Sequence, residues 1–222
     1  MVTREDIKDS LIIRLGQRSD LSSSIEREIK FAQVWLENRP FLPFFLQKNN
    51  YTVNTSSCLR VYPLPTDFLR EVDIAGIKGS FLVGEPNQEE CASQAFEEVR
   101  KYDPGVLDVR YINATPGKPT GYAIQGAEFL LGPTPDRTYT VLLRSYFARA
   151  AELTGSASTN VWTLNSPDSL IAATGLRMSM GFLKSEKVYA EFRAYFDEVE
   201  RSLIAADVGR QEAGVVRTFG EM

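Results

Sequence analysis

Histidine is absent from the 222-residue sequence, and cysteine occurs only twice. Histidine is the commonest general base and the commonest metal ligand in proteins. Its absence therefore excludes hydrolases that rely on imidazole and zinc sites that are ligated by histidine. The two cysteines, Cys58 and Cys91, lack the spacing of metal ligands, and a disulfide framework needs more of them. We expect both to be free thiols.

The sequence also lacks any apolar run long enough to cross a bilayer. Its first ten residues, MVTREDIKDS, are charged where a signal peptide is basic and then apolar. We therefore expect a soluble protein that is made in the cytosol and has no membrane partner. The net charge of -4 and the pI near 5.1 argue against nucleic-acid binding, because such binding needs clustered lysine and arginine.

Motifs that carry chemistry are missing as well. Neither GK[ST] nor GxGxxG occurs among the glycines. The paired carboxylates Glu89/Glu90 and Glu97/Glu98 are adjacent residues of a predicted helix, and adjacent helical side chains do not share a site. Cys91 has no histidine or cationic neighbour that would activate its thiol. We predict no catalytic, cofactor-binding or metal-ligating residue, no cofactor, and no enzymatic activity.

Helical periodicity is present near the start of the chain. Thr3 is a predicted N-cap with Asp6 in the capping-box position, and Gly16 ends this first helix. A second helix is predicted from the serines at 22–24 to the segment that begins at Pro40. The apolar NRPFLPFF stretch that follows is expected to be buried, in the core or against another subunit. The predicted core face comprises Ile7, Leu11, Leu15, Ile25, Ile29, Ala32 and Leu36.

A second helical zone lies downstream. Ser166 is a predicted N-cap, Pro167 occupies the first helical position, and Asp168 favours the positive end of the helix dipole. Another helix is predicted to begin at Ser185. It carries an apolar stripe at helical spacing, formed by Tyr189, Phe192, Phe196, Val199 and Leu203.

The segment between these zones has strand character. Short β-like runs cover residues 51–82, and QEECASQAFEEVRKY reads as the one helix of this segment. The run VLDVRYI and a loop with Pro116, Gly117 and Pro119 follow it. Residues 121–147 predict a hairpin whose turn contains Pro133, Pro135 and Asp136. The alternating residues expected to face a core are Tyr122, Ile124, Phe129, Leu131, Tyr139, Val141 and Leu143.

The predicted fold class is therefore α+β. N- and C-terminal helices, residues 1–48 and 160–208, form a helical bundle, because each needs a partner for its apolar face. Residues 49–159 form a β-rich insertion with one helix. Residues 209–222 lack sustained periodicity and are expected to be a flexible C-terminal tail.

Several segments, taken in order, carry a resemblance: RSDLSSSIEREIKFAQVWLE, YPLPTDFLREVDI, PTGYAIQGAEFLLGPTPDRTYTVLLRSYF and NSPDSLIAATGLRMSMGFLKSEKVYAEFRAYFDEVERSL. Together they resemble the head-to-tail adaptor (connector) proteins of tailed bacteriophages, particularly those of short-tailed phages. The most specific elements are LPTDFLRE, GYAIQG with GPTPD shortly after it, and the helix pair that a Pro-Asp step initiates. The resemblance covers nearly the whole chain.

The resemblance implies a structural virion protein at the head-tail interface. Such adaptors assemble as homo-oligomeric rings, usually dodecamers, beneath the portal protein, and a tail or nozzle protein docks onto them. Genomic DNA passes through the channel without specific binding, and the acidic composition of this chain suits that role. In relatives the C-terminal segment docks onto the portal. The corresponding candidates for portal contact here are Val215, Val216, Arg217 and Phe219.

Two other functions stay open at the level of sequence. In the first, the β-rich insertion is a binding module for a carbohydrate or peptide, with Tyr111, Tyr122 and Tyr139 as stacking surfaces. In the second, carboxylates alone act as the acid and base of a glycosidase. For the hairpin itself, the hypotheses are a rigid β platform that faces tail proteins and a cover for the apolar face of the bundle.

Overall fold

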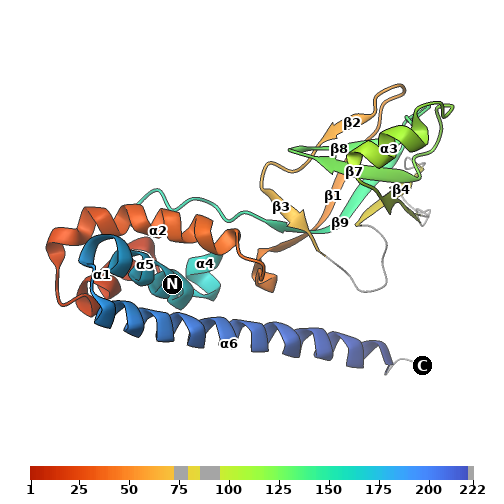
Figure 1. The fold of residues 1–222 in the computed structure, drawn as a ribbon. Coiled ribbons are helices and arrows are strands. Elements are labelled where there is room, and N and C mark those ends of the chain that lie inside the picture. The colour runs from red at the N-terminus through yellow and green to blue at the C-terminus, as the bar shows by residue number, and fades with distance from the viewer. Residues whose placement is uncertain (73–79, 86–95, 220–222) are drawn as a thin grey trace. The chain divides into compact units, whose positions relative to one another are not determined.

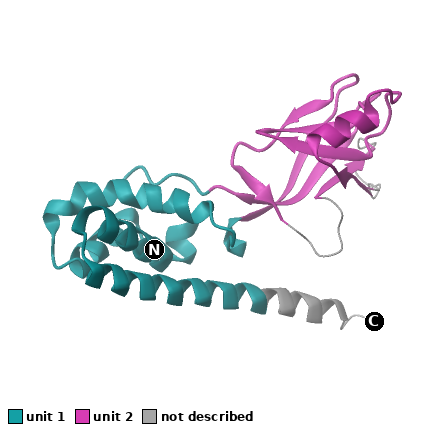
Figure 2. Ribbon diagram, viewed as in Figure 1, with its two compact units in different colours: residues 1–46, 150–222 teal, residues 47–149 magenta. Residues whose placement is uncertain are grey.

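The computed structural model describes residues 1–72, 80–85 and 96–219, with side chains up to residue 209 (Figure 1). The chain has the predicted α+β fold and divides into two compact units, shown in Figure 2. Residues 1–46 and 150–222 form the helical unit, and residues 47–149 form the β unit. Cys91 lies outside the described residues, and Cys58 is an exposed free thiol.

Elements from both ends of the chain build the helical unit. α2 packs against α5, and α5 packs against both α1 and α6. A short π-helical segment joins α5 to α6. The elements are α1 (Arg4–Arg14), η1 (Ser19–Leu21), α2 (Ser22–Glu37), η2 (Phe44–Leu46), α4 (Val161–Asn165), α5 (Pro167–Met178), η3 (Ser179–Leu183) and α6 (Glu186–Phe219).

The start of α1 confirms the predicted capping box. The Thr3 hydroxyl accepts a hydrogen bond from the Asp6 amide at 3.3 Å, and the Asp6 carboxylate accepts one from the Thr3 amide at 2.7 Å. These bonds satisfy backbone donors that the first helical turn leaves without partners. The helix ends where Gly16 adopts φ +80°, a left-handed conformation that costs glycine least.

The contact between α5 and α6 is close because Gly175 has no side chain. A Cβ atom at that position would lie 2.1 Å from Cε1 of Phe192. Phe192 and Phe196 are both buried, as the apolar stripe predicted, whereas Tyr189, Val199 and Leu203 are half-buried. The NRPFLPFF stretch was expected to be buried, and this is confirmed for Leu42 and Pro43. Its three phenylalanines are half-buried.

Two sheets make up the β unit. Within the described residues, the first sheet contains β1 (Gln47–Asn54), β3 (Phe68–Glu71), β4 (Phe81–Gly84), β5 (Glu97–Glu98) and β9 (Thr140–Ala148). β9 pairs with β1, β3 and β4, all antiparallel, and Gln47 of β1 is the partner of Phe147. The second sheet has the order β2 (Val61–Pro63), β8 (Glu128–Gly132), β7 (Gly121–Gln125) and β6 (Arg100–Lys101).

Side chains from both sheets meet in one aromatic core. The ring of Phe81 in the first sheet lies 4.5 Å from that of Tyr122 and 4.7 Å from that of Phe129, both in the second sheet. The alternation predicted for residues 121–147 is confirmed, since its inward-facing members belong to this core. These are Tyr122, Ile124, Phe129, Leu131, Tyr139, Val141 and Leu143.

The predicted turn of this hairpin is wrong. The hairpin is β7–β8, and Gly126, with φ +64°, lies in its turn. Residues 133–136 instead lead from β8 in one sheet to β9 in the other. Three apolar runs follow each other here, and sequence spacing alone does not say which neighbours pair.

Two further expectations about this region are corrected. Of the helix predicted for residues 88–102, the part from residue 97 forms β5 and β6, because Val99 is buried between exposed neighbours in strand alternation. The rest lies largely outside the described residues. The insertion also contains helix α3 (Pro104–Tyr111), where no helix was expected; Pro104 initiates it, and its Leu107 packs on the second sheet.

The expected boundaries of the units were residues 48/49 and 159/160, and the compact units change at 46/47 and 149/150. Residues 150 and 151 contact α2, since the Gln33 amide donates to both of their carbonyl oxygens at 3.1 and 3.4 Å. Where a tail was expected from residue 209, the bounds of α6 extend to Phe219. The flexibility of this segment stays a prediction.

A polar cluster is buried at one side of the β-unit core. The Tyr122 hydroxyl donates to the Glu71 carboxylate and accepts from the Ser80 amide at 3.2 Å, and Lys101 forms an ion pair with Glu71. Burial, followed by the negative charge of Glu71, raises the pKa of Tyr122 far above its ordinary value near 10.

This raised pKa predicts loss of stability in alkali. Tyr122 contributes fully below pH 10, and the contribution is lost as pH rises from there toward the folded-state pKa, because only the unfolded chain releases the proton. The slope is about 1.4 kcal/mol per pH unit for one group. Urea unfolding at about pH 9 and pH 11 should show a smaller alkaline loss in Tyr122→Phe than in the parent. An equal loss in both proteins would contradict this assignment.

Candidate functional site

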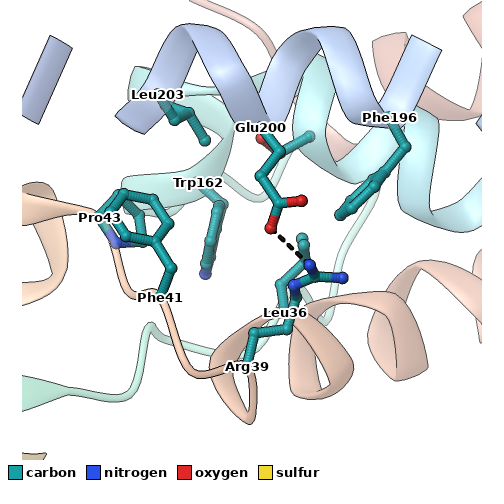
Figure 3. Close-up of a pocket in the computed structure, with 9 residues that line it drawn as sticks. Leu36, Arg39, Phe41, Pro43, Trp162, Phe196, Glu200 and Leu203 are labelled. Atoms are coloured by element: carbon teal, nitrogen blue, oxygen red, sulfur yellow. Dashed lines mark hydrogen bonds and ion pairs between the residues drawn. The ribbon is translucent and has the colours of Figure 1, made fainter. Parts of the chain in front are cut away.

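The helical unit contains an apolar groove, drawn in Figure 3, that has about 310 Å³ of empty space including its open mouth. The end of α2, the segment that follows it, α4, α5 and α6 contribute to its walls. The lining residues are Leu36, Arg39, Phe41, Pro43, Trp162, Ser169, Phe196, Glu200 and Leu203.

Trp162 forms one wall, and a local cap fixes its position. The Asn160 side chain accepts hydrogen bonds from the amides of Trp162 and Thr163 at 3.0 and 3.1 Å, which starts α4 at this point. The indole ring lies 5.1 Å from Phe45 in an edge-to-face arrangement, and its N–H donates to Glu37 at 3.4 Å. The indole is therefore held by packing and by a hydrogen bond in a buried environment.

One ion pair crosses the groove. The Arg39 guanidinium contacts the Glu200 carboxylate at 2.5 Å, as Figure 3 shows, and joins the end of α2 to α6. The same guanidinium lies 5.0 Å from the ring centre of Trp35 and 4.9 Å from that of Phe196. An apolar floor with one charged pair suits the binding of an apolar side chain from a partner. The residues that line the groove include no nucleophile with an adjacent general base.

Among the side chains that the structure describes, no group of three or more acidic, cysteine or histidine residues is placed to hold a metal ion. Among the helices described, none combines the length and apolar composition that crossing a bilayer requires.

The predicted portal-docking residues, Val215, Val216, Arg217 and Phe219, lie at the end of α6. Their side chains are outside the described part of the structure, so their docking role stays a prediction. Sequence reasoning missed the groove itself. The sequence predicted that Phe41 and Pro43 are buried and that Phe196 lies on a packing stripe, but Arg39 and Trp162 join them only through tertiary contacts.

The tyrosines proposed as stacking surfaces for a ligand do not form such a surface. Tyr122 and Tyr139 are 0% and 2% exposed, respectively. Tyr111 lies against the second sheet, where a Cβ at Gly132 would be 2.4 Å from its ring. The binding-module hypothesis therefore loses the residues on which it was based.

The structure defines a two-unit α+β chain with an apolar groove in its helical unit. The sequence profile of the SU10 adaptor protein family matches residues 2–218, and the chain belongs to this family. No curated protein matches the chain. The family confirms the resemblance found in the sequence, and identifies a structural adaptor of the bacteriophage virion.

Proposed function

We propose that this protein forms a ring beneath the portal, connects the capsid vertex to the tail or nozzle protein, and lines the channel through which DNA leaves. Copies of the chain are made in the host cytoplasm and assemble beneath the portal, and the expected ring is a dodecamer. The observation that carries this proposal is the family match over residues 2–218, which includes both units.

Physical properties of the chain support the same function. A net charge of -4 gives passing DNA few cations to bind, so the phosphate backbone is not held. The groove of the helical unit offers an apolar recess for a neighbouring protein. The aromatic core of the β unit gives the β7–β8 hairpin a rigid base, which suits a platform for tail proteins.

Electron microscopy of the purified chain mixed with its portal tests the proposal directly. We expect an additional ring of density on one face of the portal and no such ring when the chain is omitted. A chain that stays monomeric and leaves the portal unchanged would contradict the proposal.

Deleting residues 209–222 should weaken portal attachment by at least about tenfold and change the stability of the helical unit by no more than about 1 kcal/mol. The unit should survive because Phe192 and Phe196, which anchor α6 in the core, precede the deletion. Attachment is measured by co-sedimentation with portal particles, and stability by urea unfolding. A full-length variant with alanine at Val215, Val216, Arg217 and Phe219 separates these side chains from the length of the segment.

Undiminished attachment of the truncated chain would remove the C-terminal segment from portal docking. It would leave the ring itself to be judged by microscopy.

A further inference from the structure

One exposed surface of the helical unit combines aromatic rings with arginines; we call it the α2–η3 patch, formed by Arg27, Phe31, Arg177 and Phe182. Phe31 is 50% exposed and Phe182 is 41% exposed. The Arg177 guanidinium lies 5.6 Å from the ring centre of Phe31, and Arg27 lies at the same distance from Phe182. These contacts form two arginine–aromatic pairs, and Glu28 joins them because both arginines approach its carboxylate.

The charges of this patch are unevenly matched. Arg177 contacts Glu28 at 2.9 Å, and Arg27 approaches the other oxygen of the same carboxylate at 4.0 Å. Two arginines therefore share one buried carboxylate, and the surface that they present with the aromatic rings is cationic. Such a surface fits a partner that offers an aliphatic side chain next to acids.

The same chain carries a surface of that kind on α1, formed by Asp6, Asp9 and Ile13, and we call it the α1 stripe. All three residues are exposed, and Ile13 is 68% exposed. Positions 6, 9 and 13 fall on one face of a helix with 3.6 residues per turn. Hydrogen bonds from Thr3 lower the pKa of Asp6, which keeps its carboxylate ionised.

The α1 stripe and the α2–η3 patch each face away from the side on which α1 and α2 meet. Lys8 of α1 contacts Glu26 of α2 at 3.3 Å, which identifies the sides on which these helices meet. At about 100° per residue, Ile13 lies about 140° around α1 from Lys8, and Phe31 lies about 140° around α2 from Glu26. Each surface therefore faces away from the neighbouring helix, so one copy can use both at once.

We propose that the α1 stripe of one copy binds the α2–η3 patch of the next copy. Two different, complementary surfaces that face away from each other make a heterologous contact, and such contacts generate a ring when the rotation between copies closes. Ile13 then packs against the rings of Phe31 and Phe182, while Asp6 and Asp9 face Arg27 and Arg177. This inference rests on the proposed ring and names the residues that would join its subunits.

Cysteine cross-linking tests the contact in assembled rings on the portal. Cys58 and Cys91 are replaced by serine, Ile13→Cys and Phe182→Cys are introduced together, and a bifunctional maleimide is added. We expect a ladder of covalent multimers of this chain. Each single-cysteine variant serves as one control, and a pair of Ile13→Cys with Val109→Cys, which is 76% exposed in the β unit, serves as another.

The outcomes separate this contact from the ring itself. Rings that are visible by microscopy but give no ladder beyond the controls would overturn the contact and leave the proposed function intact. Cross-links from Phe182→Cys to the portal or a tail protein, in place of a second copy, would also overturn it. If no ring forms at all, both the proposed function and this contact fail.

Charge reversal provides a second test that keeps the fold intact, because Asp9 and Arg27 are exposed. Asp9→Arg and Arg27→Asp should each reduce ring assembly about tenfold, and the double variant should recover most of that loss. Single variants that assemble like the parent, or a double variant no better than the singles, would contradict the pairing of these two charges.

Discussion

Replacing Phe192 by aspartate is expected to unfold the helical unit. Phe192 is 5% exposed, and its ring lies against Gly175, so α5 and α6 are in close contact at this point. The substitution removes a buried aromatic ring, which costs about 3–5 kcal/mol, and buries a carboxylate that has no partner there. Because whole domains are stable by only about 5–15 kcal/mol, a loss of this size is close to the total.

Tryptophan fluorescence during urea unfolding measures this effect selectively, since both tryptophans, Trp35 and Trp162, belong to the helical unit. Ala194→Asp is the matched control, because Ala194 is exposed on the same helix two residues further on. We expect the control to stay within about 1 kcal/mol of the parent. An aspartate at 192 that leaves the fluorescence transition unchanged would contradict the assignment of this helix face.

The second large effect is expected in the β unit, from Glu71→Ala. The Glu71 side chain is 7% exposed, and it accepts the Tyr122 hydrogen bond and pairs with Lys101. Its removal leaves a buried hydroxyl without an acceptor and separates an ion pair, for which we expect a loss of about 3 kcal/mol. Lys101 itself is half exposed, so water can solvate its ammonium group once the carboxylate is absent.

A comparison of variants identifies the cause of this loss. Glu71→Gln keeps an oxygen that accepts from Tyr122 and should retain more stability than alanine. The double variant Glu71→Leu with Tyr122→Phe removes the unpaired hydroxyl but leaves the Ser80 amide without its acceptor, so it should lose about as much stability as Glu71→Ala. Amide hydrogen exchange of β9 reports the β unit. If glutamine and alanine variants exchange equally fast, the hydrogen bond is not the source of stability.

The sequence predicted those elements whose signals are local. The capping box at Thr3 and the stripe that contains Phe192 depend on residues within a few turns of each other, and both are confirmed. The prediction for residues 97–112 is wrong, because β5 is selected by pairing with β4, β6 by pairing with β7, and helix α3 by packing on β7 and β8. Strand propensity in short segments is easily overridden by such contacts.

The groove illustrates the same limit for the functional site. Arg39 and Glu200 are far apart in the sequence, and nothing in the local pattern of either residue indicates the other. Trp162 similarly acquires its role from Phe45 and Glu37. Both of these residues precede the β unit in the sequence, whereas Trp162 follows it. The family resemblance was predictable because it depends on the order of segments along the sequence and not on tertiary contacts.

The pairing of Gln47 with Phe147 has a consequence for how this architecture can change. Residues near the two ends of the β unit are neighbours on adjacent antiparallel strands, at a separation of about 5 Å. The whole β unit can therefore be exchanged as a cassette, because a replacement needs only two termini at a similar spacing to leave the helical framework continuous. A different insertion at this point would thus change the β unit without breaking the helical framework.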